Sequence, residues 1–271
     1  MTTTQHDKAT LLRSLHTTPK SPLLLPNAWD VASALLVEEA GASAVATTSA
    51  GVAWSLGAPD GDALDRDRAL DLIARIAAAV RVPVTADIEG GFADTAEGVG
   101  ETVAAVIAAG AVGVNLEDGT RDPAEQAGRI AAARAAADKS GVPLYVNARV
   151  DTYLFGLGEE SGRLAETIRR MHAYVAAGAD GVFVPGVTDP ETIAALVAAV
   201  DVPLNVLAGP GAPTAAELAE LGVSRVSLGG GVACAAYAVV RRAARELLTS
   251  GTYDSVVGAV PHGELNALFK S

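Results

Sequence analysis

The sequence predicts a closed (β/α)8 barrel, the TIM-barrel fold, and two regularities indicate it. Short β-branched runs alternate with alanine-rich segments of helical periodicity from residue 22 to residue 250, which is typical of a parallel sheet whose strands are joined by helices. Three connections share the endings "EEAGASAV", "IAAGAVGV" and "VAAGADGV", while Pro83, Pro143 and Pro203 recur at a spacing of 60 residues. Because such a rhythm indicates βα units repeated around a ring, we expect a barrel rather than an open sheet.

Eight runs qualify as strands, because each is short, apolar and rich in β-branched residues. In chain order they are Leu23–Pro26, Ala44–Thr48, Val82–Asp87, Gly113–Glu117, Leu144–Arg149, Gly181–Val184, Leu204–Leu207 and Arg225–Leu228.

The segments between the strands are predicted to be amphipathic helices. Examples are "DALDRDRALDLIARIAAAV" and "DPAEQAGRIAAARAAADKSG", and several of these segments begin at Asp and end at Gly, the residues that cap helices. The length of 271 residues suits one barrel. No change of composition divides the chain, so we expect a single domain over residues 1–271.

The last twenty residues, 252–271, are expected to form a helical tail. Leu265, Leu268 and Phe269 recur there at helical spacing. The pattern fits equally a cap on the chain's own barrel and a helix packed on a partner subunit. The sequence pattern alone does not choose between these two arrangements.

Composition and charge exclude several classes of protein. Half of the residues are apolar and 19% are charged, as in a well-buried globular domain, and the formal charge of −12 argues against a nucleic-acid partner. The chain has neither a signal-peptide core nor about eighteen consecutive apolar residues, so we expect no membrane partner and a cytoplasmic location. The single cysteine, Cys234, lies in an apolar helical run, and we expect it to be a buried hydrophobic residue.

Active sites of barrels lie at the carboxyl ends of the strands, and there the sequence places a ring of oxygen donors around one arginine. The ring comprises Asn27, Trp29, Asp30, Thr47, Thr48, Ser49, Asp87, Glu89, Glu117, Asp118, Asn147, Arg149, Asp151 and Asn205, with glycines 229–231 after the last strand.

Crowded carboxylates raise each other's pKa unless a cation lies among them. Magnesium suits this inventory, because it prefers oxygen ligands and keeps waters that further carboxylates can hold. All four histidines lie in the tails or in a helix, which disfavours a zinc site. The alternative is that Asp87 and Glu89 only cap loops or pair with an arginine.

Four ordered motifs, "ATTSAGVAWSLGAPDG", "VPVTADIEGGF", "GVNLEDG" and "VNARVDTY", resemble the strand-end motifs of the isocitrate lyase and phosphoenolpyruvate mutase superfamily. The resemblance implies that Asp87, Glu89 and Glu117 organise Mg²⁺, or Mn²⁺, directly or through water. It further implies that Asp87, Glu117 and Arg149 are catalytic. By resemblance or by position, the expected substrate-binding residues are Trp29, Thr48, Ser49, Ala50 and Asn205. The resemblance, together with the apolar triad of the tail, also implies a homo-oligomer, a dimer or tetramer with possible exchange of the C-terminal helix between subunits.

The resemblance also implies an activity. Its chemistry is the formation or use of a pyruvate-type enolate, so we expect a magnesium-dependent carbon–carbon lyase or decarboxylase acting on a small 2-oxo or 2-hydroxy dicarboxylate. The lyases' K-[KR]-C-G-H loop is absent, and "GTRDPAEQAGRI" replaces it. Pro185 lies near the position at which the lyases have a substrate-binding glutamate. Decarboxylation fits this departure, because carbon dioxide leaves without a protein acid.

Two other activities remain open at this point. One is a phosphonate-bond mutase or hydrolase of the same superfamily. The other treats the glycines of "LAGPGAPT" and "SLGGGVA" as a phosphate cradle in a metal-independent enzyme or binding protein for a phosphorylated metabolite.

Overall fold

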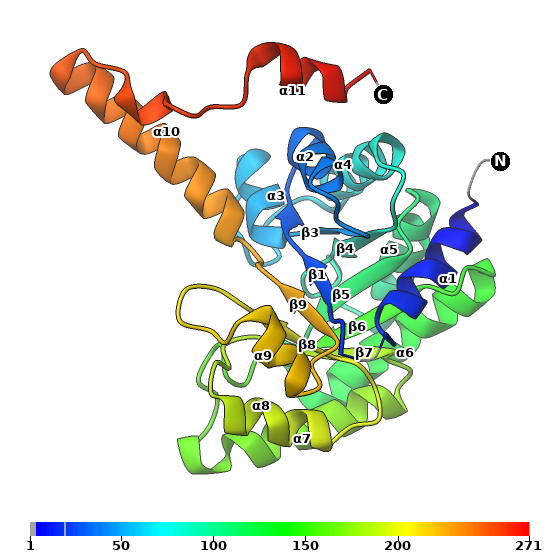
Figure 1. Cartoon of the computed structure of the whole chain (residues 1–271). Helices are drawn as coiled ribbons and strands as arrows, with labels where there is room; N and C mark the ends of the chain where they lie inside the picture. The colour runs from blue at the N-terminus through cyan, green and yellow to red at the C-terminus, as the bar shows by residue number, and fades with distance from the viewer. Residues whose placement is uncertain (1–3, 19, 271) are drawn as a thin grey trace.

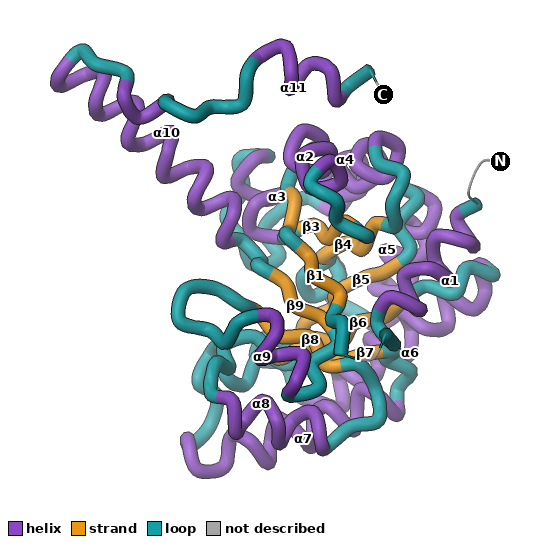
Figure 2. The backbone as a smooth tube through the Cα atoms, viewed as in Figure 1, coloured by secondary structure: helices purple, strands orange, loops and turns teal. Residues whose placement is uncertain are grey.

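The computed structural model describes residues 4–18 and 20–270, and over these residues the chain forms a parallel β-barrel surrounded by helices (Figures 1 and 2). The sheet order is β1-β9-β8-β7-β6-β5-β4-β3-β2. The strands are β1 Leu23–Leu25, β2 Asn27–Ala28, β3 Val45–Thr47, β4 Val84–Asp87, β5 Gly113–Glu117, β6 Tyr145–Arg149, β7 Gly181–Val184, β8 Leu204–Leu207 and β9 Arg225–Ser227.

The barrel closes through its first strand, which is divided at Pro26. β1 pairs with β9 and β2 pairs with β3, while Pro26 between them has no N–H to give to a ladder. The two pieces therefore act as one barrel strand, and the predicted (β/α)8 fold is confirmed. The other seven strands match the predicted ranges to within two residues.

Most helices lie outside the sheet, as Figure 2 shows. Capping explains where several begin: Asp65, Asp122 and Asp189 each accept a hydrogen bond from a backbone N–H of the first helical turn. The helices are α1 Gln5–Leu15, α2 Val31–Glu39, α3 Ser49–Ser55, α4 Arg66–Ala79, α5 Ala96–Ala108, α6 Pro123–Ser140, α7 Glu160–Ala176, α8 Pro190–Ala198, α9 Ala215–Glu220, α10 Gly231–Ser250 and α11 His262–Leu268, with a 3₁₀ turn, η1, at Asp254–Val256. No helix within the described residues is long and apolar enough to span a membrane.

The core has two parts, one between strands and helices and one inside the barrel. The inner part fills the amino-terminal end of the strands, where Leu12 of α1 is packed with Leu23, Leu25 and Ala46. A Cβ built on Gly113 of β5 would lie 2.8 Å from Leu12 Cδ2. Helix α1 thus closes this end of the barrel, and the opposite end remains available for a site.

Helix α10 does not fold back over the barrel but runs away from it (Figure 1). Its apolar side chains are left in solvent: Val240 is 63% exposed and Leu248 is 84% exposed. Leu24, on the outer side of β1, is 49% exposed. The expectation that Cys234 is buried is wrong, because this residue lies on the exposed part of α10.

The expected C-terminal helical extension is present as η1 and α11. In the single chain α11 lies beside α2 (Figure 1), and Leu268 packs against the main core. Phe269 remains 55% exposed. The assignment of residues 1–271 to one domain, with residues 252–271 as its tail, stays a prediction.

Candidate active site

The carboxyl ends of the strands enclose a small cavity of about 110 Å³. Strand register aligns the polar side chains around it: Asp87 is opposite Asn115, Asn115 opposite Asn147, and Glu117 opposite Arg149. The cavity is lined by Asn27, Thr48, Ser49, Ala50, Asp60, Asp87, Asn115, Arg149, Leu154, Phe183, Pro185, Leu207, Ser227, Gly229 and Gly230.

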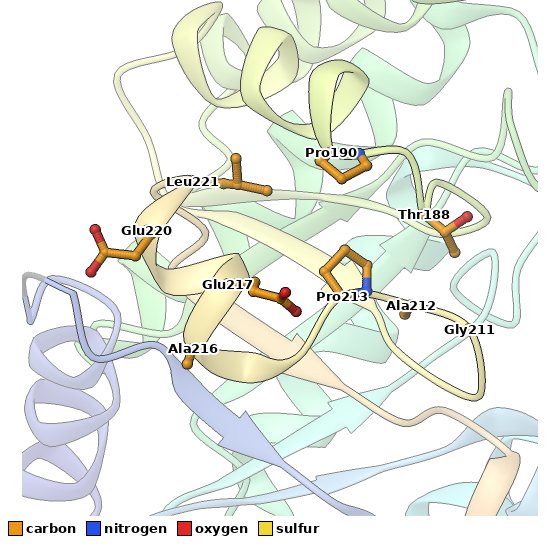
Figure 3. A pocket seen from close by; sticks show the side chains of 9 residues that line it. All are labelled: Thr188, Pro190, Gly211, Ala212, Pro213, Ala216, Glu217, Glu220 and Leu221. Atoms are coloured by element: carbon orange, nitrogen blue, oxygen red, sulfur yellow. The ribbon is translucent and has the colours of Figure 1, made fainter.

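A larger cavity, of about 720 Å³, lies outside the barrel between α8 and α9 (Figure 3). Glu217 and Glu220 are its only charged lining residues, and the side chain of Glu217 is used in the capping box of α9. None of the described residues that line this cavity is cationic, and the cavity lies away from the strand-end carboxylates. We therefore place the candidate active site in the smaller cavity.

Asp87 lies at the end of β4 and is held by its neighbours. Its backbone N–H donates to Thr47 Oγ1 at 2.8 Å, and its Oδ1 accepts from the N–H of Glu89 at 3.2 Å. Burial raises the pKa of Asp87 above its ordinary value, although Arg149 opposes the shift; the charge of Asp60 adds to the rise. Asp87 and Asp60 therefore form an acidic pair whose charge a cation would stabilise.

Asp60 lines the cavity but is not among the site residues predicted from the sequence. It follows α3 in the loop that contains "GAPDG", and only the folded loop shows that it lines the cavity with Asp87. The signal available in the sequence was an acidic residue in the loop after a barrel strand, within a motif already assigned to the site.

Arg149 is clamped by two carboxylates. Its Nη1 lies 2.5 Å from Glu117 Oε2, and its Nε lies 2.7 Å from Asp151 Oδ1. Burial would lower the pKa of Arg149, but the neighbouring carboxylates, Glu117 first, raise it above its ordinary value. Burial raises the pKa of Glu117 to about 8 despite the arginine. The guanidinium is thus fixed at the rim with its charge intact.

Glu89 does not line the cavity. The backbone at Glu89 is left-handed, with φ +51°, and its Oε2 accepts hydrogen bonds from the N–H groups of Gly61 and Asp62. Burial raises the pKa of Glu89 to about 7. The structure therefore places Glu89 behind the loop that carries Asp60, where it fixes that loop.

Asp118 is also turned away from the cavity. It is fully buried, and its Oδ2 accepts from Arg170 Nη1 and from the Tyr174 hydroxyl, both at 2.7 Å. Its Oδ1 accepts from the N–H of Asp151 at 2.8 Å. Asp118 is therefore the centre of a buried network that ties the end of β5 to α7.

Of the residues expected to bind substrate, Thr48, Ser49 and Ala50 line the cavity, whereas Trp29 and Asn205 do not. Trp29 packs beneath α3, where a Cβ on Gly51 would come within 2.6 Å of Trp29 Cβ. Asn205 is buried and accepts from the Ser227 hydroxyl at 3.3 Å. Both residues support the cavity wall from behind.

Two amides of the glycine loop after β9, those of Gly229 and Gly231, are paired within the protein. Asn27 Oδ1 accepts from the N–H of Leu228 at 3.0 Å and of Gly229 at 2.7 Å, and the N–H of Gly231 donates to Leu228 O. Amides that are already paired are not available to cradle a phosphate. This arrangement does not favour the phosphate-binding alternative.

The residues present fit a magnesium ion held largely by water. Within residues 4–18 and 20–270, no three His, Cys, Asp or Glu side chains are arranged to hold an ion by themselves. Magnesium commonly uses one or two carboxylates and keeps several waters. Asp87 and Asp60 supply such a pair beside the Asn115 carboxamide.

Comparison with known proteins identifies the family. A model of the family named phosphoenolpyruvate phosphomutase matches residues 12–248. The chain belongs to this family. The protein Rv1998c of Mycobacterium tuberculosis strain H37Rv is 40% identical over 246 residues, which cover 91% of each chain.

Solved structures of the phosphoenolpyruvate phosphomutase superfamily agree over nearly the whole chain. A Burkholderia cenocepacia J2315 structure is 42% identical with a TM-score of 0.91, covering 98% of this chain and 97% of its own. Phosphonopyruvate hydrolase in complex with oxalate and Mg²⁺ is 30% identical with a TM-score of 0.83, covering 96% and 94%. Similar structures also include oxaloacetate acetylhydrolase with oxalate, 2,3-dimethylmalate lyase and phosphoenolpyruvate phosphomutase. The superfamily therefore contains lyases, hydrolases and mutases, and the phosphonopyruvate hydrolase structure holds Mg²⁺.

Proposed function

We propose that the protein is a magnesium-dependent carbon–carbon lyase or decarboxylase that acts on a small 2-oxo or 2-hydroxy dicarboxylate through a pyruvate-type enolate. The observation that carries the proposal is that Asp87 and Arg149, a strand-end carboxylate and a fixed guanidinium, line one cavity of about 110 Å³. A cavity of this size suits a small acid.

One group of side chains serves the metal ion and another serves the substrate carboxylate. Asp87 and Asp60 hold Mg²⁺ or Mn²⁺, Glu89 fixes the loop that carries Asp60, and Glu117 orients Arg149. The metal, when bound, supplies Lewis-acid stabilisation of negative oxygen. Arg149 binds a carboxylate of the substrate and stabilises charge that develops beside it, while Thr48, Ser49 and Ala50 form the adjoining wall.

The connection after β5 favours decarboxylation or a simple cleavage within this class. Only residues 118–122 separate β5 from α6, and they contain Arg121 but no Lys or Cys. In decarboxylation the carbon–carbon bond breaks and carbon dioxide leaves. The electron pair of the broken bond remains on the other fragment as the enolate, which later takes a proton from water. No protein acid is needed for the leaving group.

Asp87→Asn tests the proposal. The variant is expected to lose magnesium binding, measured by calorimetry, and to lose pyruvate release by at least about a hundredfold. The substrates to screen are oxaloacetate, alkylmalates, methylisocitrate and phosphonopyruvate. Asp201→Asn, an exposed residue before β8, is the matched control and should behave as the wild type. Unchanged turnover in Asp87→Asn would contradict the proposal, and so would phosphonopyruvate as the preferred substrate.

A further inference from the structure

Arg225 is a second arginine inside the barrel, and it has no ion-pair partner among the described residues. It lies on β9 and is 1% exposed. Its Nε and Nη1 have no hydrogen-bond partner within the described chain, and its Nη2 reaches Asn115 Oδ1 at 3.5 Å. A buried guanidinium without a carboxylate is costly to keep, so its position calls for an explanation.

Arg225 lies one layer beneath the candidate active site. It precedes by two positions Ser227, which lines the cavity, so both side chains point to the same face of β9. Its contact, Asn115, also lines the cavity and lies opposite Asp87 in the β4–β5 ladder. Arg225 therefore reaches the cavity through a residue of the cavity floor.

The Asn115 carboxamide is oriented from below. Its Oδ1 accepts from Asn147 Nδ2 at 2.7 Å as well as from Arg225. With both lone pairs of the oxygen engaged, the NH₂ group is the part of the carboxamide left for a ligand. Arg225 and Asn147 together fix which end of Asn115 serves the cavity.

Three titratable groups influence the charge on Arg225: Tyr145, Asp87 and His16. His16, stacked on Tyr145 with a ring-centroid distance of 3.9 Å, is neutral because burial, and then Arg225, lower its pKa to about 3. Tyr145 is neutral because burial raises its pKa. Of these three groups, Asp87 is therefore the one that can supply a negative charge near neutral pH.

We propose that Arg225 is a positioning residue that acts from beneath the cavity, where its charge balances the acidic pair Asp60 and Asp87 and its contact orients Asn115. This inference rests on the proposed function, in which the cavity takes a divalent cation and then a small carboxylate. A buried positive charge at this position weakens the binding of the cation and strengthens the binding of the anion. The two effects have opposite signs.

The test measures two affinities by calorimetry, for Mg²⁺ alone and for oxalate at saturating Mg²⁺. Arg225→Met removes the charge at similar volume, Arg225→Gln removes it but keeps a donor for Asn115, and Arg225→Lys keeps the charge. Both charge-free variants are expected to bind Mg²⁺ at least about fivefold more tightly and oxalate at least about fivefold more weakly. Arg225→Lys should stay within about twofold of wild type for both.

Arg13→Met is the control for net charge, because Arg13 pairs with Asp180 at the closed end of the barrel, 2.6 Å away. It should leave both affinities within about twofold of wild type. The inference is overturned if Arg225→Met and Arg225→Gln weaken both affinities together or change neither. It is also overturned if neither of them folds while Arg225→Lys does, since the charge would then serve only the fold. Failure of the wild type to bind Mg²⁺ would instead refute the proposed function, and the inference with it.

Discussion

Arg149 lies between two carboxylates that use two of its three nitrogens. Glu117 pairs with Nη1 and Asp151 with Nε, and Arg149 also lines the cavity. The pairing holds the planar group still, so Nη2 can meet a ligand carboxylate with little loss of side-chain entropy. The residue combines a structural ion pair with a place in the cavity lining.

Arg149→Lys is therefore expected to reduce kcat/KM for pyruvate release by about a hundredfold or more. A lysine is a single point charge and cannot keep both carboxylates while reaching the substrate. Steady-state kinetics would measure the loss, and the melting temperature would show whether the fold is retained. Near-full activity would mean that Arg149 serves only as a structural ion-pair residue.

The buried glutamates predict how stability depends on pH in the metal-free protein. Burial raises the pKa of Glu89 to about 7 and of Glu117 to about 8, from 4.5. Between pH 4.5 and about pH 8 the folded state therefore binds more protons than the unfolded state. The free energy of unfolding accordingly falls as the pH rises through this interval. His16, whose pKa is lowered from 6.5 to about 3, has the opposite effect: it makes stability rise with pH between about pH 3 and pH 6.5. Above pH 6.5 it adds no further pH dependence.

We accordingly expect the melting temperature in EDTA to decrease from about pH 6.5 to about pH 8. Glu117→Gln should flatten this slope, and saturating magnesium should reduce it because the ion favours the ionised site. Calorimetry at several pH values would measure the trend. A melting temperature that rises across this interval would refute the assignment of raised pKa values.

Part of the cavity lining could be predicted from the sequence, for definite physical reasons. Asp87 and Arg149 are the last residues of barrel strands and Thr48 follows one directly, so the position of the strand end was enough to place them beside the cavity. Glu89 does not line the cavity, because its left-handed backbone turns the side chain toward the Asp60 loop, and no sequence pattern predicts such a turn. Asp60 belongs to a loop whose path only the fold defines.

At the scale of elements, the Asp118 network fixes α7 to the end of β5. Asp118 is fully buried and pairs with Arg170 at 2.7 Å. Because the same carboxylate also accepts from Asp151 and Tyr174, it aligns the loop after β5 with the loop after β6. The position of Arg149 and Asp151 thus depends on a helix outside the barrel.

Asp118→Asn is expected to lower the free energy of unfolding by about 3 kcal/mol, because it leaves Arg170 without its buried partner charge. The matched control is Asp71→Asn, which removes an equally short Arg–Asp pair, also 2.7 Å, from the exposed surface of α4. The control should change stability by about 0.5 kcal/mol or less. Denaturant titration would compare them, and equal losses in the two variants would contradict the role of the network.

Strand positions were predictable because parallel strands, covered on both sides, are short apolar runs. The division at Pro26 follows from the missing proline N–H and could have been anticipated. Burial of Cys234 was predicted wrongly, because α10 has the alanine-rich pattern of a covering helix. The sequence pattern does not reveal that α10 runs away from the barrel (Figure 1).

For the whole molecule, the projecting helix predicts an assembly. α10 leaves the barrel with Val240 and Leu248 exposed, while Leu24 on β1 lacks a covering helix (Figure 1). An exposed apolar helix and an uncovered strand are complementary, and each fully buried side chain of this kind contributes about 1.5–3 kcal/mol. We expect a second copy to provide the missing contacts.

Light scattering is expected to show a dimer or tetramer, and truncation after Gly251 should dissociate it or cause aggregation. Leu248→Asp on α10 should have the same effect, whereas Leu11→Asp, on the 44% exposed Leu11 of α1, is the control and should not. A monomeric intact chain, or a truncated chain that keeps the native oligomer, would rule out the helix exchange.

Helix α1 closes one end of the barrel with Leu12, and this closure affects how substrate enters and products leave. The cavity is blind, so substrate and products must share one doorway at the carboxyl ends of the strands. If the enzyme cleaves its substrate in two, the fragment nearer the doorway has to depart before the deeper one can. The deeper fragment, which leaves last, is then expected to compete with incoming substrate for the empty cavity, whereas the outer fragment, which leaves first, is expected to inhibit by rebinding above the deeper one.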